Sequence, residues 1–122
     1  MSLLHRLRKW VDAASGGEHR VSAAELSAFV GAKEKLFILD VRSPQEFRGD
    51  GHIAGANLIP LGELAGHLKK IPTDRMVVTV CRSGARSGSA HAQLQNAGFT
   101  NVKNLSGGMM AWQSAGLPVV RK

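Results

Sequence analysis

The sequence predicts an α/β fold, in which helices alternate with the strands of a mostly parallel sheet. Apolar runs at 36–39 and 76–80 are short and continuous, as in strands that are buried on both faces of a sheet. Segments with helix-start patterns lie between such runs, so the two kinds of element alternate along the chain. With 122 residues, of which 43% are hydrophobic and 20% charged, the chain fits one soluble globular domain.

Local signals divide the chain into elements. A serine followed three residues later by glutamate, the capping box, occurs at Ser22 and at Ser43 and predicts two helix starts. Pro60 ends a short strand, and Gly107 and Gly108 allow a close backbone approach near the last helix. The expected order is a short edge strand at 18–21, a helix at 23–30, a strand at 36–39, a short helix after residue 43, a strand at 57–59, a helix at 61–70, a strand at 76–80, a helix at 87–97, a strand at 102–105 and a helix at 109–114.

Residues 1–15 predict an amphipathic helix ahead of this domain. Its apolar residues, Leu3 and Leu7 among them, share one face, and its basic residues lie off that face. Two roles stay open for it: packing on the domain surface, or docking to a membrane surface or a partner. The predicted division is therefore 1–17 for the helix and its linker and 18–122 for the domain.

Charge is unevenly distributed along the chain. The net charge is +7; residues 1–60 hold 8 Lys and Arg against 7 Asp and Glu, whereas residues 61–122 hold 8 against 2. A basic second half is expected if the ligand is a small anion that is steered by the electrostatic field. Direct nucleic-acid binding is not expected, because only 5% of the residues are aromatic and no basic run is interleaved with stacking side chains.

The composition also limits compartment and cofactors. One cysteine excludes an internal disulfide, and the N-terminal stretch lacks the pattern of a signal peptide, so we expect a cytoplasmic protein. The apolar runs are too short for a transmembrane helix. The histidines are widely spaced and no cofactor fingerprint is present, so neither a metal site nor a cofactor is predicted. The sequence does not indicate an oligomeric state.

The stretch around Cys81 carries the strongest functional signal. From Val77 to Ser89 it reads VVTVCRSGARSGS, in which a predicted strand ends at the cysteine and a Gly-containing loop leads into a predicted helix. This geometry directs backbone N–H groups and the positive end of a helix dipole at one point. A thiol at that point has its thiolate stabilised, and the thiolate is the nucleophilic form of cysteine.

The loop after the cysteine predicts a cradle for an anionic substrate. It consists of Arg82, Ser83, Gly84, Ala85 and Arg86, whose backbone N–H groups supply preorganised donors. The two arginines can grip an oxyanion, although each is also compatible with a solvated surface charge. The serine either donates a hydrogen bond to a bound sulfur or only fits the turn.

Three separated motifs resemble those of the rhodanese (sulfurtransferase) family. CRSGAR at 81–86 is similar to the six-position active-site loop of the family. The stretch from Asp40 to Ala56, with DVR, EF and GHIAGA, and the stretch from Leu105 to Trp112, with LSGG and AW, resemble its other signatures. The matches occur in the expected order and together extend over roughly residues 18–120.

The resemblance implies a rhodanese-like three-layer fold, with a mostly parallel sheet of about five strands and helices on both faces. It also implies that Cys81 attacks the outer sulfur of a donor such as thiosulfate and holds that sulfur as a persulfide. Cyanide or a thiol, including a protein thiol, then removes the sulfur. Mercaptopyruvate, glutathione persulfide and a protein persulfide stay open as donors.

The same resemblance implies a supporting role for four residues near the loop. Asp40, Arg42 and Glu46 would brace the loop that faces the active site, although their side chains also suit an acid/base set. His52 would pack under the loop, with a general base as the alternative.

Two other functions stay open at this point. A cysteine phosphatase or arsenate reductase carries five residues between its cysteine and arginine, whereas Arg86 follows after only four and the next position is Ser87. The shorter loop suits one sulfur atom better than a tetrahedral phosphoryl group. The second alternative is a persulfide carrier or protein-docking module with little thiosulfate activity, for which the N-terminal helix is the candidate docking surface.

Overall fold

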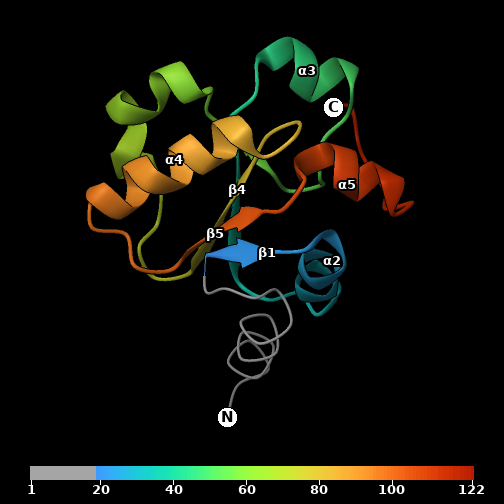
Figure 1. The fold of residues 1–122 in the computed structure, drawn as a ribbon, viewed down its shortest axis with the longest axis horizontal. Coiled ribbons are helices and arrows are strands. Elements are labelled where there is room, and N and C mark those ends of the chain that lie inside the picture. The colour runs from blue at the N-terminus through green and yellow to red at the C-terminus, as the bar shows by residue number, and fades with distance from the viewer. Residues whose placement is uncertain (1–18) are drawn as a thin grey trace.

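A five-stranded parallel sheet forms the centre of the described part of the chain, residues 19–122 of a computed structural model (Figure 1). The strand order is β1-β5-β4-β2-β3, and every adjacent pair is parallel, as predicted. The strands are β1 (Arg20–Val21), β2 (Leu36–Asp40), β3 (Asn57–Leu58), β4 (Met76–Val80) and β5 (Val102–Leu105). The helices are α2 (Ala23–Gly31), α3 (Pro44–Gly49), the 3-10 segment η1 (Leu61–Lys70), α4 (Ala85–Asn96) and α5 (Gly108–Ser114).

Side-chain alternation along the central strand β4 divides the core into two layers. Met76, Val78 and Val80 pack in one apolar cluster with side chains of α2 and α5. Val77 packs in the other cluster, with side chains of α4 and η1. Successive residues of a strand point to opposite faces, so a continuous apolar run has both faces covered. Figure 1 shows the resulting arrangement, with α4 on one side of the sheet and α2 and α5 on the other.

The helix predicted at 61–70 is the element that the sequence misjudged most. This segment forms 3-10 turns, and His67 interrupts them with φ −126° and ψ 17°. Gly62 and Gly66 lie within it, and glycine is a poor α-helix former because it loses the most backbone freedom. Only Leu64 of the segment is buried, so few packing contacts compensate for the weak propensity.

The other elements differ from their predicted bounds by two residues at most. The helix expected at 87–97 begins at Ala85, because Gly84 adopts a left-handed conformation at φ 108° and allows the helix to start directly after it. The first strand is confined to Arg20–Val21. The strands predicted at 76–80 and 102–105 have their predicted bounds.

Two predictions concern segments or properties beyond the sheet. The predicted amphipathic helix at 1–15 and its linker lie outside the described residues. Within residues 19–122, every helix is too short or too polar to cross a membrane.

Close contact between α5 and the end of β4 depends on Gly108. Its φ is +57°, and a Cβ atom there would collide with the carbonyl oxygen of Cys81 and would lie 2.6 Å from that of Arg82. The same two carbonyl oxygens accept hydrogen bonds from the N–H groups of Met109 (2.8 Å) and Met110 (3.0 Å). The predicted close backbone approach is therefore confirmed, and it fixes α5 against the loop that follows β4.

We predict that Gly108→Ala lowers the free energy of unfolding by roughly 2 kcal/mol or more, because the new Cβ meets backbone atoms at a positive φ. Gly31→Ala is the matched control, since that glycine has open space around it and no positive φ. Denaturant unfolding of both variants measures the difference. Equal stability of the two variants would contradict the role of Gly108.

Candidate active site

Cys81 lies immediately after β4, at the carboxyl end of the central strands of the sheet. Ligands of parallel α/β sheets bind at this edge. The cysteine is free and 1% exposed, and it packs in the same apolar cluster as α4. Its sulfur is therefore largely shielded from water by the protein.

Two hydrogen bonds converge on the sulfur of Cys81. The backbone N–H of Gly84 donates to Sγ at 3.0 Å, and the hydroxyl of Ser87 donates to Sγ at 3.3 Å. Gly84 precedes α4, and Ser87 lies in the first turn of that helix with its side chain buried. The loop and the helix thus act together on one atom.

These donors determine the charge state of the thiol. Burial raises the pKa of Cys81, but the hydrogen bonds from the Ser87 hydroxyl and from the backbone N–H groups of Ser87, Gly84 and Ser83 outweigh burial. The pKa of the thiol consequently lies below its ordinary value of 9.0. A lowered pKa increases the thiolate fraction near neutral pH, and the thiolate is the reactive form.

A second chain of hydrogen bonds connects the loop to the sheet. The Nδ2 group of Asn104, on β5, donates to the carbonyl oxygen of Gly84 at 3.3 Å. The Oγ1 hydroxyl of Thr79, on β4, donates to Oδ1 of Asn104 at 3.3 Å. The position of the loop thereby follows the position of the two neighbouring strands.

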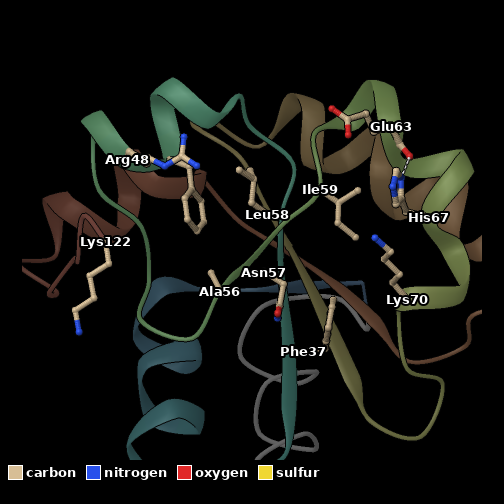
Figure 2. A pocket seen from close by; sticks show the side chains of 11 residues that line it. Phe37, Arg48, Ala56, Asn57, Leu58, Ile59, Glu63, His67, Lys70 and Lys122 are labelled. Carbon is tan, nitrogen blue, oxygen red and sulfur yellow. Dashed lines mark hydrogen bonds between the residues drawn. The ribbon is translucent and has the colours of Figure 1, made fainter.

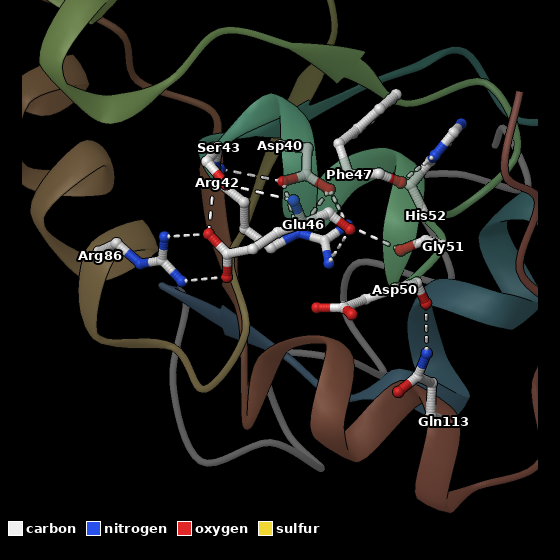
Figure 3. Close-up of polar contacts among 10 residues, drawn as sticks. All are labelled: Asp40, Arg42, Ser43, Glu46, Phe47, Asp50, Gly51, His52, Arg86 and Gln113. Carbon is white, nitrogen blue, oxygen red and sulfur yellow. Dashed lines mark hydrogen bonds and ion pairs between the residues drawn. The ribbon is translucent and has the colours of Figure 1, made fainter.

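Asp40 and Arg42 form a fully buried ion pair. The Nη2 and Nε groups of Arg42 donate to the carboxylate of Asp40 at 2.8 and 2.9 Å, and each side chain is 1% exposed (Figure 3). Nη2 also donates to the carbonyl oxygen of Gly51 at 2.9 Å. These contacts connect the end of β2 to the loop after α3.

Glu46 and Arg86 form a second ion pair, which the sequence did not predict. The Nη1 and Nη2 groups of Arg86 donate to the two carboxylate oxygens of Glu46 at 2.7 and 2.8 Å (Figure 3). The same carboxylate accepts from the N–H of Ser43 and completes the capping box of α3. The hydrogen bonds from Arg86 are the main cause that lowers the pKa of Glu46 to about 2.

The remaining predicted site residues occupy different surroundings. His52 stacks on the ring of Phe47 at 3.5 Å between ring centroids, and its Nδ1 group donates to the carbonyl oxygen of Phe47 at 2.8 Å. The contacts of its side chain are thus with the α3 segment, and its backbone pairs with that of Val120. Arg82 and Ser83 are exposed on the loop, and Ala85 is exposed at the first position of α4.

Sequence reasoning gave no role to Ser87 or Asn104. The third residue of a helix that starts directly after Gly84 is Ser87, and this position faces the end of the preceding strand. Its polar side chain was therefore the signal in the sequence that could have predicted a contact with Cys81. For Asn104 the signal is weaker, because its contact with Gly84 joins residues that are 20 positions apart.

A cavity lies away from Cys81, along the edge strand β3. It has a volume of about 600 Å³, and its lining includes Phe37, Leu58 and Lys70 (Figure 2). None of the predicted site residues lines it. Among residues 19–122, no group of His, Cys, Asp and Glu side chains is arranged to hold a metal ion.

Comparison with known proteins identifies the family. The family model described as "Rhodanese-like domain" matches residues 22–115, which contain the cysteine loop and both ion pairs. This chain belongs to the rhodanese family.

Individual relatives of this rhodanese agree with that result. It is 38% identical over 102 residues to a protein named sulfurtransferase from Allochromatium vinosum, a match that covers 84% of this chain and 94% of the relative. It is 40% identical over 93 residues to thiosulfate sulfurtransferase 16 of Arabidopsis thaliana, covering 66% and 76%. Other relatives are longer proteins, and the match covers 49% of one and 24% of another.

A solved structure confirms the fold. A rhodanese-related protein from Thermoplasma volcanium superposes with a TM-score of 0.78 at 33% identity, covering 85% of this chain and 99% of that protein. The predicted rhodanese-like fold and membership of a sulfurtransferase family are therefore both shown.

We predict that Ser87→Ala shifts the pH profile of Cys81 alkylation by iodoacetamide to higher pH. Loss of the hydroxyl donor raises the thiol pKa, so the rate at neutral pH should fall about tenfold, the factor that corresponds to about 1.4 kcal/mol. Ser89→Ala, an exposed position on the same helix, is the control. An unchanged profile in Ser87→Ala would show that the hydroxyl does not stabilise the thiolate.

We also predict that Glu46→Gln removes a part of the stability that depends on pH. Because the pKa of Glu46 is lowered on folding from 4.5 to about 2, its ionised form stabilises the fold above pH 4.5, and this contribution disappears as the pH falls through 2. Urea unfolding should find the variant less stable at pH 7, with the gap to the wild type narrowing below pH 4.5. A gap that stays constant over this pH range would refute this role.

Proposed function

We propose that this rhodanese transfers a sulfane sulfur from thiosulfate, or from another persulfide-type donor, to cyanide or a thiol through a persulfide on Cys81. The observation that carries the proposal is the sulfur of Cys81, which is buried, free and hydrogen-bonded by Gly84 and Ser87. The relative named thiosulfate sulfurtransferase 16 supports thiosulfate as a donor.

The first half-reaction loads the sulfur. The thiolate of Cys81 attacks the outer sulfur of thiosulfate, an Sγ–S bond forms, and the S–S bond of the donor breaks. Sulfite leaves with the electron pair of that bond. The hydrogen bonds that lower the pKa of Cys81 favour this step, because they maintain the thiolate that attacks the sulfur donor.

The second half-reaction unloads it. Cyanide or a thiolate attacks the outer sulfur of the persulfide, the Sγ–S bond breaks, and its electron pair returns to Cys81 as thiolate. The hydrogen bonds from Gly84 and Ser87 then stabilise the negative charge that develops on Sγ. One covalent intermediate shared by two substrates gives ping-pong kinetics.

Positive charge around the loop supports an anionic donor. Arg82 follows Cys81 directly and is exposed, so we assign it contact with the substrate anion. Arg86 is held by both carboxylate oxygens of Glu46, which balance its charge, so it adds little positive potential of its own. Four residues between Cys81 and Arg86 support sulfur transfer in preference to phosphoryl transfer.

A reducing compartment suits this chemistry. Sulfur transfer requires that Cys81 stays reduced, and the chain has a single cysteine. We therefore propose that the protein acts in the cytoplasm.

We predict that Cys81→Ser lowers thiocyanate formation from thiosulfate and cyanide by at least about 10⁴-fold, as expected when an essential nucleophile is lost. Serine is nearly isosteric with cysteine, so thermal unfolding should verify that the variant folds. The wild type should give parallel double-reciprocal plots. Substantial activity in Cys81→Ser would exclude the cysteine as the nucleophile.

A further inference from the structure

A cavity adjoins the reactive loop and shares Arg82 with the site proposed for the donor anion. Its volume is about 350 Å³, which is within the range of ligand-binding pockets. Its lining includes Arg82, Met110, Arg121 and Asp50. Thiosulfate and cyanide are small compared with this space, so the cavity suits a larger substrate.

Backbone contacts hold this cavity against the loop that carries Cys81. Met109 and Met110 line the cavity, and their N–H groups donate to the carbonyl oxygens of Cys81 and Arg82. A molecule in the cavity is thus next to the loop, on the side formed by α5. Met110 is 53% exposed and offers an apolar contact there.

Charges in the cavity are of both signs. Arg82 and Arg121 form no ion pair with a carboxylate of the described residues, so two cationic groups are available. The charge of Arg42, which also lines the cavity, is balanced by Asp40. The backbone carbonyl of Asp50 accepts from Gln113, and its carboxylate points away from that contact (Figure 3).

Arg121 is held in place at this cavity. Its Nε group donates to the carbonyl oxygen of Gly49 at 3.2 Å, which leaves the two terminal nitrogens of the guanidinium for a ligand. Paired terminal N–H groups bind a carboxylate in a bidentate geometry. The neighbouring Lys122 lines the other cavity, along β3.

We infer that this cavity binds the non-reacting part of a thiol peptide, with Arg121 and Arg82 holding carboxylates and Asp50 holding the ammonium group. This inference rests on the proposed function, because the bound thiol is the acceptor that unloads Cys81. Its thiolate, having lost its proton to water, attacks the outer sulfur of the persulfide. The Sγ–S bond breaks, its electron pair stays on Sγ, and the peptide leaves as its persulfide.

The test compares three acceptors after loading with thiosulfate: glutathione as the thiol-peptide probe, 2-mercaptoethanol as a thiol without charged groups, and cyanide. The measured quantity is kcat/KM for glutathione divided by kcat/KM for 2-mercaptoethanol. We expect Arg121→Ala to lower this ratio about tenfold, Arg121→Lys to retain most of it, and Asp50→Asn to lower it severalfold. Lys122→Ala, the matched control, should keep the wild-type ratio.

The outcomes separate this inference from the proposed function. A selective fall of the ratio in Arg121→Ala, with rescue by lysine, supports the inference. Normal thiocyanate formation with an unchanged ratio, or a wild type that uses glutathione no better than 2-mercaptoethanol, would overturn the inference alone. Absence of thiocyanate formation and of thiol persulfides in the wild type would overturn both.

Discussion

The hydrogen bonds that converge on the sulfur of Cys81 are the interaction on which the rest of the site depends. Gly84 and Ser87 can donate to the sulfur only while the loop between β4 and α4 keeps one conformation. Three separate elements hold it there. The N–H groups at the start of α5 bind the carbonyl oxygens of Cys81 and Arg82, Asn104 of β5 binds that of Gly84, and α4 begins directly after Gly84. The parallel sheet matters for function because it brings these elements to one edge.

Charged groups around the loop act on geometry more than on stability. The pair of Asp40 and Arg42 is buried, and the cost of removing both charges from water offsets most of their attraction. Its effect is to fix the loop after α3, through the contact with Gly51. The pair of Glu46 and Arg86 is more exposed and connects α3 to α4. Each pair is neutral overall, so the two pairs fix the segments around the loop, and the positive potential at the loop comes from the exposed Arg82.

The sequence predicted those features that depend on neighbours along the chain. β4 and β5 have their predicted bounds because short apolar runs define buried strands. Both capping boxes formed, at Ser22 and at Ser43. Contacts between distant segments were missed, such as Glu46 with Arg86, which are 40 positions apart. The segment η1 was predicted as an α-helix because basic residues at its C-terminal end are typical of one. Its two glycines lower the α-helix propensity of the segment, and it forms 3-10 turns instead.

The central claim is that Cys81 accepts a sulfane sulfur, and intact-mass spectrometry of the purified protein tests it most directly. The protein is weighed before and after incubation with thiosulfate, in a parallel sample with glutathione persulfide, and again after addition of cyanide. The account predicts a gain equal to one sulfur atom that cyanide removes completely. A mass that stays unchanged with both donors, while the thiol of Cys81 remains open to alkylation, would contradict it.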